Sequence, residues 1–135
     1  MDYRFLLDTN ICIYIRRKKP EQVLRRFTSL RQGQAVLSVI TFGELIYAAE
    51  KSLHRPEALK QLQELAELLP VMALPEGAAE TYGRMRAELE RKGTMIGNND
   101  LWISAHAKAA GLTLVTNNER EFRRVGGLKI QNWAL

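Results

Sequence analysis

Four acidic residues stand where a carboxylate could take part in chemistry: Asp8, Glu44, Asp100 and Glu121. Carboxylate oxygens are the ligands that hard divalent ions such as Mg²⁺ and Mn²⁺ prefer, and such ions promote hydrolysis of phosphodiesters. Two carboxylates about 5 Å apart repel each other by roughly 3 kcal/mol at an effective dielectric constant of about 20. A gathered set of these acids must therefore take up a proton or a cation. Zinc is not expected, because the cysteine and the two histidines have no ligand spacing.

Each acid also has a structural explanation that needs no metal. Asp8 could make a turn after a strand, and Asp100 could favour the start of a helix through the helix dipole. Thr41 and Glu44 match a capping box, in which both side chains satisfy the backbone at a helix N-terminus. Glu121 could be a solvated helix residue. The chemical hypothesis therefore depends on the four acids as a set.

The charge balance favours a polyanionic partner. Lysine and arginine total 20 against 15 acidic residues, which gives a formal charge of +5 and an isoelectric point near 9.6. Such a protein attracts nucleic acids over long range and by counterion release, although many soluble proteins are also basic. The single cysteine, Cys12, allows no internal disulfide and fits a reducing compartment. No signal peptide or membrane span is apparent, so we expect a cytoplasmic protein without a membrane partner.

The pattern of apolar residues predicts a single domain over residues 1–135, built from alternating strands and helices. Short apolar runs predict strands at 3–7, 35–37, 71–74, 112–115 and, as an edge strand, 128–130. Longer amphipathic stretches predict helices at 9–17, 21–27, 41–53, 56–69, 75–92, 98–110 and 119–125.

This alternation implies crossover connections and a mostly parallel sheet of four or five strands in a three-layer α/β/α architecture. Ligands of such sheets bind outside the carboxyl ends of the strands. Asp8 directly follows the first strand, and the other three acids lie near the starts of helices that flank the sheet. All four acids can therefore approach the same edge of the sheet.

At these residues the sequence resembles the PIN-domain nucleases and, within them, the VapC toxins of bacterial type II toxin–antitoxin (VapBC) modules. The matching segments occur in the family's order over nearly the whole chain: Leu7-Asp8-Thr9-Asn10, Thr41-Phe42-Gly43-Glu44-Leu45, Gly97-Asn98-Asn99-Asp100, Ile103-Ser104-Ala105-His106-Ala107 and Val115-Thr116-Asn117-Asn118-Glu119-Arg120-Glu121-Phe122. Each segment alone is weakly specific, whereas the ordered set is specific.

The resemblance implies an α/β/α fold and Mg²⁺- or Mn²⁺-dependent cleavage of RNA. In this sequence Asp8 and Asp100 match the family's principal metal ligands, Glu44 matches its third acid, and Glu121 is the nearest carboxylate to its fourth. The polar residues beside these acids are candidates for orienting ligands or contacting RNA: Thr9, Asn10, Arg86, Thr116, Asn117 and Arg120.

The family also implies partners. The expected substrate is tRNA, in particular the anticodon stem-loop of initiator tRNA, and the expected inhibitor is a VapB-like antitoxin that forms a hetero-oligomer with a toxin homodimer. Three alternatives stay open from the residues: a non-catalytic RNA-binding module with the same fold, a DNA-processing nuclease, and a phosphatase acting on small phosphoesters.

Overall fold

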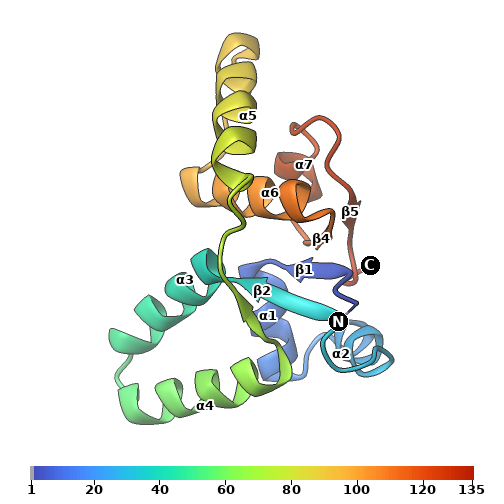
Figure 1. Cartoon of the computed structure of the whole chain (residues 1–135). Coiled ribbons are helices and arrows are strands. Elements are labelled where there is room, and N and C mark those ends of the chain that lie inside the picture. Colours follow the sequence, from blue (N-terminus) through green and yellow to red (C-terminus); the bar gives the residue numbers. More distant parts are fainter. Residues whose placement is uncertain (1) are drawn as a thin grey trace.

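The computed structural model describes residues 2–135, which form five strands and seven helices (Figure 1). The strands are β1 Phe5–Leu7, β2 Ala35–Ser38, β3 Val71–Met72, β4 Thr113–Val115 and β5 Ile130–Gln131. The helices are α1 Thr9–Arg17, α2 Glu21–Thr28, α3 Val39–Glu50, α4 Arg55–Leu68, α5 Ala78–Lys92, α6 Asn98–Ala110 and α7 Glu119–Phe122. Among the same residues, no helix is both long and apolar enough to cross a membrane.

The five strands form one parallel sheet in the order β3-β2-β1-β4-β5. β1 lies at the centre, where Leu6 pairs with Val36 of β2 on one side and with Leu114 of β4 on the other. The predicted parallel sheet and its edge strand are thereby confirmed. The order reverses direction at β1, so the carboxyl ends of β1, β2 and β4 are neighbours at the point where ligands bind in open parallel sheets.

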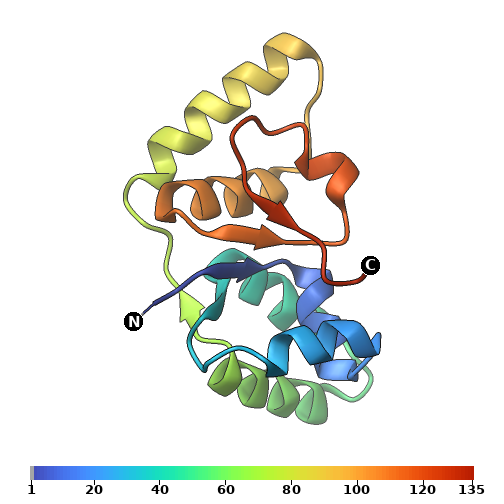
Figure 2. The same ribbon diagram turned by 90° about the vertical axis from the view of Figure 1, so that its right-hand side faces the viewer.

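Helices cover both faces of the sheet, which confirms the three-layer architecture (Figure 2). Phe5 and Leu7 of β1 pack into a core cluster with residues of α1, α2, α3 and α4. Leu6, between them, packs on the opposite face with Ile103 of α6 and Phe122 of α7. This alternation follows from the pleat of a strand, and burial on both faces explains why the strands are apolar throughout.

Several helix boundaries coincide with those predicted. α1 and α6 have the predicted bounds, and α5 and α6 end at Gly93 and Gly111. Both glycines are left-handed, with φ of 67° and 69°, a conformation that residues with a side chain rarely adopt. The sequence thus identifies helix ends most reliably where a glycine must reverse the chain.

Two predicted helix starts are wrong. α3 begins at Val39 rather than Thr41, because the Ser38 side chain accepts a hydrogen bond from the Ile40 amide and caps the helix there. Thr41 is buried inside the helix and cannot form the capping box with Glu44. α5 begins at Ala78 rather than Pro75, because the segment from Pro75 makes a turn first, closed by the bond from the Ala78 amide to the Pro75 carbonyl.

Candidate active site

Asp8 occupies the junction between β1 and α1, and it has a structural role of its own. Its Oδ1 accepts a hydrogen bond from the Ile11 amide at 3.0 Å and so caps α1. Its Oδ2 accepts a hydrogen bond from the Thr116 hydroxyl at the end of β4. The Asp8 backbone amide also bonds to the Val115 carbonyl at 3.0 Å. The carboxylate is therefore buried and fixed at the carboxyl ends of two adjacent strands.

The polar residues around Asp8 hold the loop after β4 against α1. The Thr116 hydroxyl, besides donating to Asp8, accepts a bond from the Asn118 amide at 2.9 Å. The Asn117 side chain donates to the Tyr14 hydroxyl at 2.7 Å and accepts from Asn10 at 3.4 Å. Asn10, Thr116 and Asn117, which the sequence offers as candidates for orienting ligands or contacting RNA, thus lie beside Asp8, and the Tyr14 hydroxyl joins their network.

Glu44 enters the site from α3. Its Oε1 accepts a hydrogen bond from the Thr9 hydroxyl of α1 at 2.9 Å, which joins the two helices beside the carboxyl end of β1. Both residues line an open cleft of about 660 Å³ that also includes Asn99 from the first turn of α6. Glu44 therefore lies in this cleft beside α1, and it is not the cap of α3, which is Ser38.

Asp100 and Glu121 approach each other from α6 and α7. Glu121 accepts a hydrogen bond from the Gly97 amide at 3.0 Å and another from the Asn118 side chain at 2.7 Å. A Cβ added to Gly97 would lie 3.6 Å from Asp100 Oδ2 and 4.0 Å from Glu121 Oε1, so both carboxylates lie beside this residue. The Gly97 amide and Asn118 were not assigned by the sequence analysis.

The electrostatics confirm that the four acids lie close enough to affect one another. Burial and, in decreasing order, the charges of Glu121, Glu44 and Asp8 together raise the pKa of Asp100 to about 6. Burial also raises the pKa of Asp8, although hydrogen bonds from Thr116 and Ile11 oppose this effect. The fold thus places three other carboxylates near enough to Asp100 for their charges to raise its pKa.

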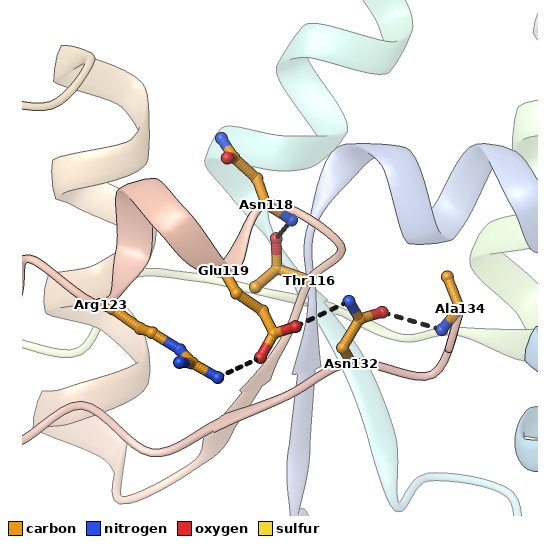
Figure 3. A network of polar contacts seen from close by, with 6 residues as sticks. All are labelled: Thr116, Asn118, Glu119, Arg123, Asn132 and Ala134. Carbon is orange, nitrogen blue, oxygen red and sulfur yellow. Dashed lines mark hydrogen bonds and ion pairs between the residues drawn. The ribbon is translucent and has the colours of Figure 1, made fainter.

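The neighbouring acid Glu119 takes part in polar contacts with Arg123 and Asn132 (Figure 3). Glu119 accepts hydrogen bonds from Arg123 at 2.7 Å and from Asn132 at 3.0 Å, and Asn132 in turn accepts from the Ala134 amide. These contacts tie α7 to the segment after β5. Of the two acids on α7, Glu121 is therefore the one that belongs to the site.

The two arginines predicted to contact RNA lie differently. Arg86 of α5 donates to the Tyr82 hydroxyl at 2.9 Å and to Glu90 at 3.2 Å, and Tyr82 bonds to Asn98 at the start of α6. Through Tyr82, Arg86 is connected to the start of α6, the helix that carries Asp100. Arg120 of α7 is exposed beside Glu121, and it makes no hydrogen bond or ion pair within residues 2–135.

The four acids suit a hard divalent cation by the chemistry of their donors. All of them offer oxygen, and the pKa of Asp100 is raised first by burial and then by the other carboxylates, two effects that a bound cation would oppose. Within residues 2–135, however, no three or more carboxylate, imidazole or thiol side chains form a group already placed to hold an ion. The thiol of Cys12 offers no alternative nucleophile, since burial and then Asp8 raise its pKa far above the usual range.

Comparison with known proteins identifies the family. The PIN domain model matches residues 5–128. The tRNA(fMet)-specific endonuclease VapC of Shigella flexneri is 44% identical over 131 residues, which cover 97% of this chain and 98% of that protein. Ribonuclease VapC2 of Rickettsia felis is 38% identical over 130 residues, covering 96% and 97% of the two chains.

The fold agrees with these relatives. A chain in the crystal structure of DNA-bound VapBC from Salmonella typhimurium superposes with a TM-score of 0.91 at 44% identity, over 97% of this chain and 98% of that one. A chain of VapBC2 from Rickettsia felis, solved with a DNA fragment of its promoter, gives 0.89 at 37% identity over 96% and 98%. This chain therefore belongs to the PIN domain family and, within it, to the VapC proteins.

Proposed function

We propose that this protein is a toxin endoribonuclease that hydrolyses a phosphodiester bond of tRNA, with initiator tRNA as the expected substrate. The observation that carries the proposal is the placement of Asp8, Glu44, Asp100 and Glu121 near the carboxyl ends of adjacent parallel strands, where Glu44 bonds to Thr9 and Gly97 lies beside both Asp100 and Glu121. Support for the substrate comes from the VapC of Shigella flexneri, which is named as specific for tRNA(fMet) and matches nearly the whole chain.

The proposed reaction depends on a divalent cation, Mg²⁺ or Mn²⁺, held by Asp8 and Asp100 with Glu44 and Glu121 beside them. When bound, this cation would neutralise charge on the phosphodiester and lower the pKa of water. The chain's own part is to hold the buried carboxylate of Asp8 in place through hydrogen bonds from Thr116 and Ile11. Because these groups are already held in place, they need not rearrange when charge develops in the transition state.

The bond changes follow from in-line attack by water. The water oxygen forms a bond to phosphorus, its proton passes to a carboxylate of the site, and the bond from phosphorus to the 3′ oxygen breaks. That oxygen takes up a proton, so the products carry a 5′-phosphate and a 3′-hydroxyl. A 2′,3′-cyclic phosphate would contradict this mechanism, because it forms only when the 2′-hydroxyl of RNA is the nucleophile.

The test is cleavage of purified initiator tRNA, with elongator tRNAs and single-stranded DNA as competing substrates. We expect one dominant cut in initiator tRNA with Mg²⁺ or Mn²⁺, none with EDTA, and none with Asp8→Asn or Asp100→Asn. Asp2→Asn is the matched control, because Asp2 is exposed and is the remaining aspartate of the chain. Equal cutting by the mutants would contradict the site, and preferential cutting of DNA would favour the DNA-processing alternative. Binding without cutting would favour the RNA-binding module.

We further propose that a VapB-like antitoxin neutralises this protein. The solved relatives from Salmonella typhimurium and Rickettsia felis are described as VapBC complexes, and each matches nearly the whole chain. Expression of the chain alone should arrest growth, and co-expression of the neighbouring open reading frame should restore growth and co-purify with the chain. Unchanged growth upon expression of the active chain would contradict the toxin assignment.

A further inference from the structure

The cleft of about 660 Å³ beside Glu44 extends along α3 away from the acids. Thr9, Glu44 and Asn99 contribute its polar lining, and Val39, Ile40, Gly43 and Tyr47 contribute the rest. One continuous hollow therefore joins Glu44, an acid of the proposed active site, to an aromatic side chain. A polynucleotide bound with its phosphate at the acids would have a place for the next nucleotide in this cleft.

Tyr47 is unusual among the aromatic residues of this chain. It is 65% exposed, whereas every other phenylalanine, tyrosine and tryptophan is buried or half-buried. It follows Glu44 by three positions on α3, so both side chains lie on the same face of the helix. The ammonium group of Lys51 lies 4.6 Å from the centre of its ring. An exposed ring beside a cation is the combination that protein surfaces use to hold single-stranded nucleic acid.

Gly43 supplies an independent observation. It lies inside α3, where glycine destabilises a helix relative to alanine, and its backbone is not left-handed. A Cβ built there meets no atom within 4 Å, so packing within the chain does not require a glycine. The absence of a side chain at Gly43 keeps the cleft open beside Glu44 and Tyr47. A glycine at this position indicates that a molecule from outside the chain approaches the backbone of α3 closely.

Building on the proposed function, we propose that Tyr47 stacks on an unpaired base of the RNA, next to the phosphodiester that is cut. Gly43 leaves room for the ribose and Lys51 holds a neighbouring phosphate. An RNA loop fits this cleft better than an apolar protein segment does, because Thr9, Glu44 and Asn99 make part of the lining polar. Bases of single-stranded loops are those that proteins read by aromatic stacking. Tyr47 is thus a residue for substrate positioning and specificity.

The experiment uses an anticodon stem-loop RNA of initiator tRNA, with 2-aminopurine placed at each loop position in turn. Binding is measured to the full chain carrying Asp8→Asn, so that the RNA stays intact. We expect quenching at one position, retained in Tyr47→Phe and lost in Tyr47→Leu, with affinity about 10-fold weaker in Tyr47→Leu. Leucine keeps apolar bulk but lacks a ring face, so a merely structural role would not separate the two variants. Leu53→Ala is the control, since Leu53 is 98% exposed and does not line the cleft.

Steady-state kinetics with unmodified tRNA complete the test. Tyr47→Leu should raise KM about 10-fold with little change in kcat. Gly43→Leu should raise KM likewise without lowering the Tm, because the added side chain meets only the cleft. Failure of the wild-type chain to cut RNA would contradict the proposed function, whereas cutting with an unchanged KM in both variants would overturn this inference alone. A changed sedimentation coefficient in Tyr47→Leu with unchanged quenching would also overturn it, in favour of an interface between copies of the chain.

Discussion

Single residues of the acidic site differ in what they contribute to folding, although Asp8 and Asp100 are proposed to hold the same ion. Asp8 accepts hydrogen bonds from Ile11 and Thr116 that stabilise its position. Asp100 has no such compensation, and its hydrogen bond with Glu121 raises its pKa further. Replacing the two aspartates should therefore affect stability differently, because only Asp8 also serves as a helix cap.

Removing the charge of Asp100 should stabilise the metal-free protein. The carboxyl has a pKa of about 6 in the fold and an ordinary value of 3.8, so the folded state binds more protons between these values and loses stability as the pH rises through them. Asp100→Asn should therefore raise the Tm at pH 7.5 by a few degrees, equivalent to about 1 kcal/mol after allowance for partial exposure. The increase in Tm caused by Asp100→Asn should be smaller at pH 5 and should disappear below about pH 4. Thermal unfolding in EDTA measures it, and a lower Tm at pH 7.5 would contradict the prediction.

Asp8 should behave in the opposite way when its cap is removed. Asp8→Ala leaves the Ile11 amide and the Thr116 hydroxyl without their acceptor, and loss of a helix N-cap costs about 1–2 kcal/mol. Asp8→Asn should lose less, because asparagine also caps helices well. Urea unfolding at pH 7.5 compares the two variants, both of which should be inactive. Equal stability of the alanine and asparagine variants would show that the cap contributes nothing.

At the scale of elements, the active site depends on the relative placement of α3 and α6. Glu44 lies on α3 and Asp100 on α6, and a buried hydrogen bond joins the two helices. Ser38, which caps α3, lies 3.0 Å from Nδ1 of His106 on α6. Because burial lowers the pKa of His106, this contact is one between neutral groups at physiological pH. Ser38 thus fixes the start of one acid-bearing helix against the middle of the other.

Ser38→Ala should therefore affect both stability and catalysis. It removes the cap of α3 and the partner of His106, and together these should cost about 1–2 kcal/mol of unfolding free energy. kcat should fall with little change in KM, measured where both proteins are fully folded. Ser38→Thr keeps the hydroxyl and should restore most of both properties. A serine-to-alanine variant that is less stable but equally active would mean that the bond serves the fold alone.

The sequence predicted elements best where one residue decides the boundary. Gly93 and Gly111 end their helices because only glycine readily adopts the left-handed turn there. The start of α3 was missed because Ser38 also ends a strand, while Thr41 and Glu44 offered a more conspicuous capping pattern. The order of the strands could not be predicted, since each is an apolar run and pairing depends on the tertiary fold.

The acids of the site could be predicted, but their partners could not all be. A carboxylate after a strand is visible in the sequence, and so is the ordered family pattern around it. The backbone amide of Gly97 donates a hydrogen bond to Glu121. The sequence could not predict this contact, because every residue except proline has such an amide. The separation of Glu119 from Glu121 likewise depends on which way each side chain of α7 points.

For the whole molecule, the electrostatic arrangement is an acidic site in a basic protein of net charge +5. Several basic side chains form ion pairs with a glutamate four positions away in the sequence. They are Arg84, Arg86, Lys92 and Arg123. Exposed pairs of this kind contribute little to stability, but they lower the charge available to RNA. Arg120, without such a pair in residues 2–135, is better placed to bind a phosphate of the substrate.

Binding of RNA should accordingly weaken with salt, and Arg120 should account for part of that dependence. In the non-cleaving Asp8→Asn background, the logarithm of the Kd for initiator tRNA should rise linearly with the logarithm of the KCl concentration. One lost phosphate contact lowers that slope by roughly 0.7–0.9, which is the change expected for Arg120→Gln. Arg84→Gln is the matched control, because Arg84 lies on α5 and pairs with Glu80 at 3.3 Å. If the Arg120 and Arg84 variants gave the same slope as the parent, Arg120 would not contact a phosphate, and the positive charge that attracts RNA would have to come from elsewhere on the surface.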